Sequence, residues 1–461
     1  MKGLLVAAPN SASGKTTVTC ALLGALKNRG LDPCAFKCGP DYIDPMFHRS
    51  VLGVDSHNLD LFLCGEERVK KLFCRESAGH GFALCEGAMG LYDGLGGTTD
   101  RASAWHTADV LDLPILLVVR PKGASLTLAA QLRGLLEFRK NSHIAAILLN
   151  DCREMLYRSL APMLERETGL PVVGYLPHLE AGQLQSRHLG LYTAGEIEDL
   201  TDRMNILSTT LEQTVDLDRL LSLCGKTPSA VKEKNGEGEI PIAVAKDEAF
   251  CFTYAETLEE FRRAGLKPVF FSPIHDKKLP RAAALYLPGG YPELYAEALS
   301  GNTSMLESIR TAVADGLPTV AECGGFLYLG RTLENEQGQT FPMTGVLPGA
   351  GRPAGRLVRF GYAKLKAEQD SLLFRAGEEL PIHEFHYWDS TDNGAALEAF
   401  KPLNPKRRWK CGFVSETLYA GFPHLYFGGG PALADRLAQA ARTYTEEKFH
   451  EAGEHPEADR P

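Results

Sequence analysis

The sequence is short of several features, and each shortage excludes a class of protein. It lacks any apolar run near the ~18 residues of a membrane-spanning helix, and the run LLVAAP near its N-terminus is too short for a signal peptide. Lys and Arg (49) do not outnumber Asp and Glu (58), so the net charge of -9 argues against a dedicated nucleic-acid binder. The 11 cysteines show no paired metal-ligand spacing. We therefore expect a cytoplasmic protein with reduced thiols, no membrane association and no nucleic-acid partner.

Short apolar runs rich in Val, Ile and Leu recur along the chain, with helical patterns between them. Continuous hydrophobicity is typical of strands buried on both faces, so these runs predict parallel α/β sheets. The first set is LLVAAP (4–9), FALCEGA (82–88), PILLVV (114–119), AAILLN (145–150) and PVVGYLP (171–177), and the second set is IPIAVAKD (240–247), KPVFFSP (267–273), AALYLPGG (283–290) and PTVAECGG (318–325).

The stretch GKTPSAVKEKNGEGE separates the two sets. It is charged and contains glycine, which is typical of a linker. A chain of 461 residues is also long for one hydrophobic core and comfortable for two domains. We expect an α/β domain at 1–225, a linker at 226–240, a second α/β domain at 241–445 and a polar tail at 446–461.

The N-terminal segment LLVAAPNSASGKTT predicts a phosphate-binding loop. A bound phosphate needs converging backbone N–H groups, a helix N-terminus, a lysine and a hydroxyl for Mg²⁺, and each part is present after the first strand. The usual first glycine of such a loop is replaced by Pro9. The plainer interpretation is a chance Ser/Gly turn between a strand and a helix, which the Gly-Lys-Thr-Thr order disfavours. The predicted nucleotide-binding residues are Ser13, Gly14, Lys15, Thr16 and Thr17.

Acidic residues follow two further strands. Glu86 ends a buried strand, where an unpaired carboxylate is costly, so with Thr16 it is a candidate ligand of Mg²⁺. Lys37, Asp41 and Asp44 follow the second strand in KCGPDYIDPMFH. Open α/β sheets bind ligands at the carboxyl ends of their strands, so these three are substrate-binding candidates rather than solvated turn residues.

The segment TVAECGGF predicts a nucleophile on a strand-to-helix turn. Cys323 is followed by glycines that admit a substrate, and the N–H of Gly324 would face a developing oxyanion. Gly289 or Gly290 in LYLPGGYPE would supply a second donor. The alternative is a small buried residue without reactivity, the commoner role of an unpaired cysteine. The remaining cysteines are interpreted as structural.

A thiol nucleophile also needs a base, and three histidines of the second half of the sequence are candidates. His424 lies in LYAGFPHLYFGG near the end of the second domain, whereas His383 and His386 lie in IHEFHYW and would equally suit a substrate site. Sequence alone does not show which of them lies near the thiol.

Together these segments resemble the cobyrinic acid a,c-diamide synthase family, in which a P-loop amidoligase domain is fused to a class I-type glutaminase domain. The resemblance covers roughly residues 1–440, and the family's motifs occur in order as SGKTTV, KCGPDYIDPMFH, EGAMGLYDG, SRHLGL, LPGGYPE, AECGGFLYL, GVLPG and HEFHY. It implies an N-terminal dethiobiotin-synthetase-like parallel-sheet domain and a C-terminal glutaminase-like α/β domain. It also implies amidation of the a and c carboxylates of a corrinoid in cobalamin biosynthesis, with ATP, Mg²⁺ and glutamine.

The resemblance also implies roles for individual residues. Cys323 stands at the glutaminase nucleophile and His424 at the histidine that activates it, while Asp41 and Asp44 match the synthetase site. The sequence departs from the family at Tyr426, where a second histidine is usual and where other class I glutaminases have a Glu. A Cys-His dyad is therefore expected, together with transfer of ammonia to an acyl phosphate formed by ATP.

Three other functions compete with this one. A nickel-sirohydrochlorin a,c-diamide synthase of coenzyme F430 assembly would share nearly all of the motifs. A dethiobiotin-synthetase-like ATPase with an inactive glutaminase domain is disfavoured by the intact Cys323 and His424. A ParA-like ATPase that binds macromolecular partners is disfavoured by the charge and by the glutaminase half. The sequence leaves the cobalt content of the substrate, the order of amidation and the oligomeric state open, a homodimer included.

Overall fold

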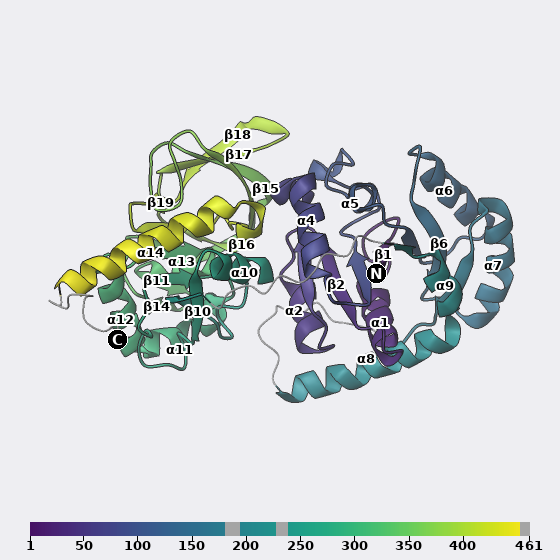
Figure 1. The fold of residues 1–461 in the computed structure, drawn as a ribbon, viewed down its shortest axis with the longest axis horizontal. Helices are drawn as coiled ribbons and strands as arrows, with labels where there is room; N and C mark the ends of the chain where they lie inside the picture. Colours follow the sequence, from purple (N-terminus) through teal and green to yellow (C-terminus); the bar gives the residue numbers. More distant parts are fainter. Residues whose placement is uncertain (180–193, 227–237, 452–461) are drawn as a thin grey trace, which may run out of the picture. The chain divides into compact units, whose positions relative to one another are not determined.

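The computed structural model describes residues 1–179, 194–226 and 238–451. These residues form two compact units, 1–179 with 194–226 and then 238–451, each with its own sheets and core (Figure 1). Both units are α/β, as predicted. The SRHLGL motif lies outside the described residues, as does most of the predicted linker.

The first unit is built on one sheet in the order β3-β2-β4-β1-β5-β6-β7, in which all these strands are parallel. The short strand β8 pairs with β1 in the antiparallel direction. Its strands are β1 (Lys2–Ala7), β2 (Pro33–Cys38), β3 (Ser56–Leu59), β4 (Phe82–Glu86), β5 (Ile115–Val119), β6 (Ile144–Asn150), β7 (Val172–Leu176) and β8 (Gly225–Lys226).

The helices of the first unit connect these strands and cover the sheet (Figure 1). They are α1 (Lys15–Asn28), α2 (Ile43–Ser50), α3 (Leu61–Cys64), α4 (Glu66–Glu76), α5 (Ala104–Leu111), α6 (Leu126–Glu137), α7 (Glu154–Thr168), α8 (Ala194–Thr214) and α9 (Leu217–Leu223). One core joins alternate residues of β1, such as Leu4 and Val6, to apolar residues of α1 and α8, such as Leu22 and Leu207. Because successive side chains of a strand point to opposite faces, these residues place α1 and α8 on the same face of the sheet.

The second unit contains a sheet in the order β10-β9-β11-β12-β20-β19, parallel except for β19. Its strands are β9 (Ile240–Ala245), β10 (Leu266–Phe271), β11 (Ala284–Leu287), β12 (Thr319–Glu322), β19 (Phe413–Val414) and β20 (Leu418–Gly421). Its helices are α10 (Ala255–Arg263), α11 (Ala296–Gly301), α12 (Thr303–Ala314), α13 (Gly324–Leu329) and α14 (Pro431–Glu451). Apolar residues of α12 and α13 share a core with one set of strand residues, and apolar residues of α14 share a core with the alternate set. The sheet is therefore covered by helices on both faces.

A further sheet in the second unit was not predicted from the sequence. It has the order β14-β13-β15-β17-β18, with β16 also paired to β15, and it lies in the chain between β12 and β20. Its strands are β13 (Thr332–Glu334), β14 (Thr340–Pro342), β15 (Ala350–Ala367), β16 (Glu379–Ser390), β17 (Leu397–Lys401) and β18 (Asn404–Cys411). Residues such as Leu365 and Ile382 of this sheet join the core that α14 covers.

The first residues of the predicted polar tail at 446–461 belong to a helix. Helix α14 continues through residues 446–451, and residues 452–461 lie outside the described part. The reason is that charged residues such as Glu446, Glu447 and Lys448 are good helix formers and do not end a helix.

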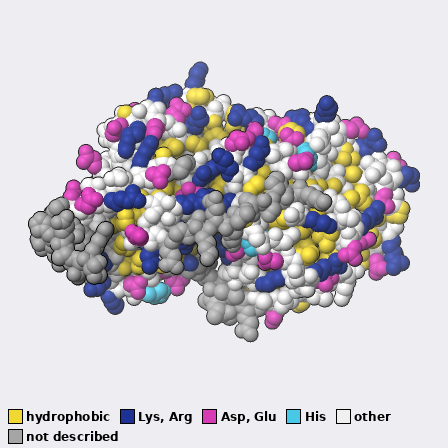
Figure 2. Space-filling model, in the orientation of Figure 1, with side chains coloured by type: hydrophobic (Ala, Val, Ile, Leu, Met, Phe, Trp, Pro, Cys, Tyr) yellow, Lys and Arg dark blue, Asp and Glu magenta, His cyan; other side chains and the backbone are white. Residues whose placement is uncertain are grey.

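Within the described ranges, no helix is both long and apolar enough to cross a bilayer. Figure 2 shows Lys and Arg side chains interspersed with Asp and Glu side chains over the face drawn there, in keeping with the mixed charge of the sequence.

Candidate active sites

The predicted phosphate loop joins β1 to the N-terminus of α1. Gly14 stands at the N-cap with a φ of 91° in the left-handed region, and a Cβ there would lie 2.0 Å from Asn150 Nδ2. Asn150 ends β6 and donates from Nδ2 to the Ser13 carbonyl at 2.9 Å. Glycine is thus required at position 14 by both its dihedral angle and its close neighbour. Sequence reasoning missed Asn150, whose only signal is a polar residue at the end of an apolar run.

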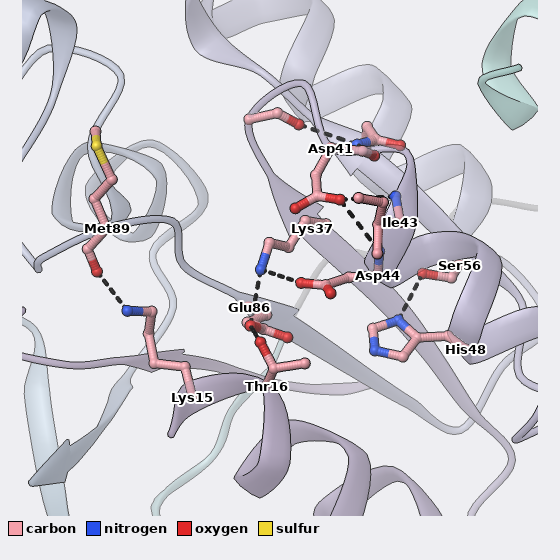
Figure 3. Close-up of polar contacts among 12 residues, drawn as sticks. Lys15, Thr16, Lys37, Asp41, Ile43, Asp44, His48, Ser56, Glu86 and Met89 are labelled. Atoms are coloured by element: carbon pink, nitrogen blue, oxygen red, sulfur yellow. Dashed lines mark hydrogen bonds and ion pairs between the residues drawn. The ribbon is translucent and has the colours of Figure 1, made fainter. Parts of the chain in front are cut away.

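Lys15 is buried at the start of α1 and reaches across to the loop that follows β4. Its Nζ donates to the carbonyl of Met89 (Figure 3) and, at 3.4 Å, to the carbonyl of Asn10. Burial lowers the pKa of its ammonium, and Glu86 acts in the opposite direction. Because both hydrogen-bond partners are neutral carbonyls, the positive charge of Lys15 is available to a phosphate.

Glu86 is the centre of a buried polar cluster at the carboxyl end of β4. Its Oε1 accepts hydrogen bonds from Thr16 Oγ1 at 2.7 Å and from Lys37 Nζ at 2.8 Å (Figure 3). The register of the sheet fixes this arrangement, since Glu86 lies beside Val6 of β1 on one side and Lys37 of β2 on the other. Three predicted residues from three separate segments therefore meet.

The same cluster suits the predicted Mg²⁺. Glu86 Oε2 is buried and has no hydrogen-bond partner, which leaves one carboxylate oxygen available beside the Thr16 hydroxyl. Among the described residues no group of three or more His, Cys, Asp or Glu side chains could hold a metal ion. Mg²⁺ commonly takes only one or two protein carboxylates and completes its shell with water and substrate phosphates. The residues present therefore fit a magnesium ion that is shared with a nucleotide.

Two of the predicted substrate residues, Lys37 and Asp44, pair with each other in the buried cluster. Lys37 Nζ contacts the Asp44 carboxylate as well as Glu86. Burial alone would lower the pKa of Lys37, but the carboxylates of Glu86 and Asp44 outweigh it and raise that pKa well above its usual value. The ammonium of Lys37 therefore stays charged and balances the two acids.

Asp41 has a different local role. Its Oδ1 accepts from the backbone N–H groups of Ile43 at 2.8 Å and Asp44 at 3.2 Å, which shapes the turn before α2 (Figure 3). Burial, together with the nearby Asp44, raises the pKa of this carboxyl group. The structure brings Asp41 close to Lys37 and Asp44 and uses one of its oxygens to hold the backbone.

Cys323 occupies the predicted turn between β12 and α13 in the second unit. Its φ of 48° and ψ of -100° are strained for a residue with a side chain, and its N–H donates to the Gly421 carbonyl at 2.8 Å. Such strain is typical of a nucleophile held on a tight turn. Burial raises the pKa of the thiol, with Glu293 adding to the effect, so the resting thiol is protonated and needs a base.

The predicted oxyanion glycines gather around this turn. A Cβ on Gly324 would lie 3.0 Å from the backbone nitrogen of Gly290, and a Cβ on Gly289 would lie 2.7 Å from His424 Cε1. The loop after β11 thus touches both the residue that follows Cys323 and the ring of His424. Burial lowers the pKa of His424 to about 3, so its imidazole is neutral at rest, and it needs a nearby negative charge to stabilise it once it takes a proton.

Comparisons with known proteins follow the same division of the chain. Residues 4–191 match the CobQ/CobB/MinD/ParA nucleotide binding domain, and residues 241–432 match the CobB/CobQ-like glutamine amidotransferase domain. The cobyrinate a,c-diamide synthase of Clostridium acetobutylicum is 40% identical over 93% of this chain and 98% of its own length. The chain belongs to the cobyrinate a,c-diamide synthase family. The synthase of the same name from Salmonella typhimurium is 38% identical over 95% of this chain and 98% of its own length.

One solved structure in the comparison is a more distant match. The structure of PurLQS from Thermotoga maritima is 18% identical and covers 45% of this chain and 99% of its own, at a TM-score of 0.32. This likeness is too low to support an argument about the site.

The two histidines of the HEFHY motif lie on β16. The N–H of His424 donates to the His383 carbonyl at 2.9 Å, and the N–H of His383 donates to the His424 carbonyl at 3.5 Å. The ring of His386 stacks on Phe422 with centroids 3.8 Å apart, and its Nδ1 bonds to the Trp388 carbonyl. His386 is therefore held by packing, while His383 supports the backbone that carries His424.

Proposed function

We propose that the protein amidates the a and c carboxylates of cobyrinate in cobalamin biosynthesis, with ATP and glutamine as co-substrates. The observation that carries the proposal is the joint presence of a nucleotide-binding family match and a glutamine amidotransferase family match, in a chain that covers 98% of a cobyrinate a,c-diamide synthase. The names of these relatives favour cobyrinate over the nickel tetrapyrrole. The reaction needs two sites, and each unit supplies one.

The first unit activates the carboxylate, whose oxygen is a poor leaving group. A carboxylate oxygen of the substrate attacks the terminal phosphorus of ATP, and ADP leaves with the electrons of the broken bond. Lys15 and the N–H groups at the start of α1 stabilise the phosphate charge, and Thr16 with Glu86 would hold Mg²⁺. That ion supplies positive charge to the phosphate oxygens. Lys37, Asp41 and Asp44 face the substrate from the neighbouring strand end.

The second unit releases ammonia from glutamine. His424 takes the proton of the Cys323 thiol, and the thiolate attacks the amide carbon while the N–H groups of Gly324 and of Gly289 or Gly290 stabilise the oxyanion. His424 then protonates the leaving nitrogen, and water hydrolyses the thioester to glutamate. Ammonia displaces phosphate from the acyl phosphate and forms the new amide.

A cytoplasmic location and small-molecule partners belong to the same proposal. All 11 cysteines of the chain are free thiols, which supports a reducing compartment. The oligomeric state, a homodimer included, is left to a sedimentation measurement.

Cys323→Ser separates the two proposed sites. The variant should lose at least about 100-fold of its glutamine-dependent amidation of cobyrinate, since the serine hydroxyl is far less readily ionised than a thiol. With ammonium salts at a pH that gives free ammonia, amidation should continue at the wild-type rate. Product masses and ADP release, measured with each nitrogen source, give the two rates.

Cys411→Ser is the matched control, because Cys411 is also a buried free thiol of the second unit. A serine there should lower the melting temperature and leave the ratio of the two rates unchanged. Equal loss of both rates in a folded Cys323→Ser variant would contradict the proposed nucleophile. Absence of amidated cobyrinate with either nitrogen source in the wild type would contradict the proposed substrate.

A further inference from the structure

The residue directly before the nucleophile is a fully buried acid that the mechanism above does not use. Glu322 ends β12 with none of its side chain exposed, although a buried carboxylate is costly unless it is paired. Its Oε1 accepts from the N–H of Leu425 at 3.1 Å, and its Oε2 accepts from the Tyr286 hydroxyl at 3.1 Å. These partners hold the carboxyl group in one orientation.

That orientation points the carboxyl group at His424. Oε2 of Glu322 lies 3.9 Å from Nδ1 of His424, while Cε1 of the same ring lies against Gly289. Nδ1 is therefore the nitrogen on the side of Glu322, and the proposed mechanism assigns Nε2 to the thiol. A carboxylate beside Nδ1 favours the tautomer that carries its hydrogen there, in which Nε2 bears the lone pair that accepts a proton.

The position that provides such an acid in other class I glutaminases is occupied here by Tyr426. Its ring packs edge-on against Tyr254 with centroids 4.9 Å apart, and a phenol cannot replace a carboxylate as an anionic acceptor. Glu322 comes before His424 in the chain, whereas Tyr426 comes after it. The parallel pairing of β12 with β20, in which Glu322 lies beside Gly421, fixes its distance from the loop that carries His424.

We propose that Glu322 is a positioning residue for His424, with its carboxylate holding the Nδ1–H and stabilising the imidazolium that forms when Nε2 takes the Cys323 proton. The inference rests on the proposed glutaminase roles of Cys323 and His424. The proton moves from sulfur to Nε2, and Glu322 gains none. The gap of 3.9 Å closes to a hydrogen bond when the ring becomes charged, as catalytic hydrogen bonds commonly tighten in the reacting complex.

The ionisation of Glu322 gives the inference a measurable pH dependence. The titratable groups that face it are Tyr286 and Tyr419 from neighbouring strands, with His424 and Cys323 beside it. Burial raises the pKa of Glu322 to about 8. Because the anionic form is the active one, the glutaminase kcat should rise as the pH increases through about 8.

Glu322→Gln tests the proposal, since the amide keeps the shape and one acceptor but never becomes an anion. We expect its glutaminase kcat to fall about 10²- to 10⁴-fold, with the upper end set by the ~10⁴-fold loss seen when the orienting acid of a serine-protease triad is neutralised. KM for glutamine should change little, the rise of kcat near pH 8 should disappear, and ammonia-dependent amidation should stay at the wild-type rate. Glu322→Asp keeps the charge and should restore part of the lost kcat.

Tyr286→Phe is the matched control, because it removes a hydrogen bond to the same carboxyl group without touching His424. Its kcat should stay within about threefold of the wild type, since a single neutral hydrogen bond is worth about 1 kcal/mol. A wild-type kcat and pH profile in Glu322→Gln would overturn the proposal. The proposal would also be overturned if Tyr286→Phe lost as much glutaminase kcat as Glu322→Gln. The same holds if Glu322→Gln lost ammonia-dependent amidation as well.

A second measurement covers the case in which Glu322→Gln does not fold. In the wild type, the rate at which iodoacetamide alkylates Cys323 should increase through a pH near 8, as Glu322 ionises and stabilises the thiolate–imidazolium pair. A profile without an inflection there would overturn the proposal. If Cys323→Ser retains glutaminase activity, the proposed function fails instead, and the two failures are thereby distinguished.

Discussion

Lys15 combines a buried position with neutral hydrogen-bond partners, which makes it the residue on which phosphate binding depends most. Lys15→Ala should reduce amidation at least about 100-fold with both glutamine and ammonia, because neither nitrogen source can react before the acyl phosphate forms. Glutamine hydrolysis by the second unit should continue. Parallel assays of product, ADP and glutamate measure the three rates.

Lys140→Ala is the control for that change, because Lys140 is exposed and lies beyond α6. It should leave all three rates unchanged. If Lys15→Ala kept most of its ammonia-dependent rate, the phosphate-loop assignment would have to be abandoned.

For single residues, the sequence predicted which side chains carry the chemistry better than it predicted which side chains contact one another. The strand-turn-helix orders around Lys15 and Cys323 are local, so each could be recognised within a few neighbouring residues. The pairing of Lys37 with Glu86 depends on the register of two strands that are far apart in the chain. Glu322 gave no separate signal, because its contact with His424 arises only once β12 and β20 pair.

Helix α1 provides a test at the scale of an element, since a glycine with positive φ stands at each of its ends. Gly14 has a φ of 91° and a close neighbour in Asn150, whereas Gly30 has a φ of 70° and nothing within 4 Å. Gly30→Ala should cost about 1 kcal/mol of unfolding free energy from backbone strain alone. Gly14→Ala should cost about 1 kcal/mol more, because Asn150 must move and release the Ser13 carbonyl.

Denaturant unfolding compares the stability of these two variants, and calorimetric titration with ATP compares their binding. Only Gly14→Ala should weaken ATP binding, because only that change alters the phosphate loop. Equal stability and equal ATP affinity in the two variants would contradict the role assigned to the Asn150 contact.

Most strands of the two largely parallel sheets were predictable, whereas the sheet formed by β13 to β18 was not. Buried parallel strands appear as short continuous apolar runs, and each predicted run overlaps a strand of the structure. β15 has two register shifts against β16, between Pro353 and Val358 and between Val358 and Gly361. Each irregularity interrupts the period-2 alternation by which an antiparallel strand is recognised.

On the scale of the whole molecule, buried acids and histidines set opposing trends of stability with pH. Burial raises the pKa of Glu293 and Glu322 to about 8 and that of Glu384 to about 7. Burial lowers the pKa of His383 and His386 to about 4 and that of His424 to about 3. Between about pH 4.5 and 6.5 the folded state holds extra protons on the acids and lacks protons on the histidines, so the two effects largely cancel.

Above pH 6.5 the histidines lose their remaining protons in the unfolded state, so the acids make the larger contribution, which Lys401, whose pKa burial lowers to about 8, offsets only in part. The folded state then binds more protons than the unfolded state, so the stability of the second unit should fall as the pH rises from 6.5 to 8. Each of Glu293 and Glu322 contributes a loss on the order of 2 kcal/mol over this window. The melting temperature should therefore drop by several degrees.

Scanning calorimetry at several pH values measures this slope. Glu293→Gln should make the slope shallower, because the amide does not ionise, whereas the exposed Glu297→Gln should leave it unchanged. A melting temperature that is constant or rises between pH 6.5 and 8 would contradict the prediction.

The pairing of β12 with β20 also limits how the sequence of the second unit can change during evolution. The proposed nucleophile and base follow two adjacent parallel strands, yet the sheet from β13 to β18 separates them in the chain. Insertions or deletions in the loops of that intervening sheet leave the spacing between Cys323 and His424 intact. A deletion of one residue within β20 turns each side chain of the strand to the opposite face and moves His424 away from the thiol. Selection can therefore reshape the loops of the intervening sheet, while β16, whose His383 bonds to the backbone of His424, and the lengths of β12 and β20 stay fixed.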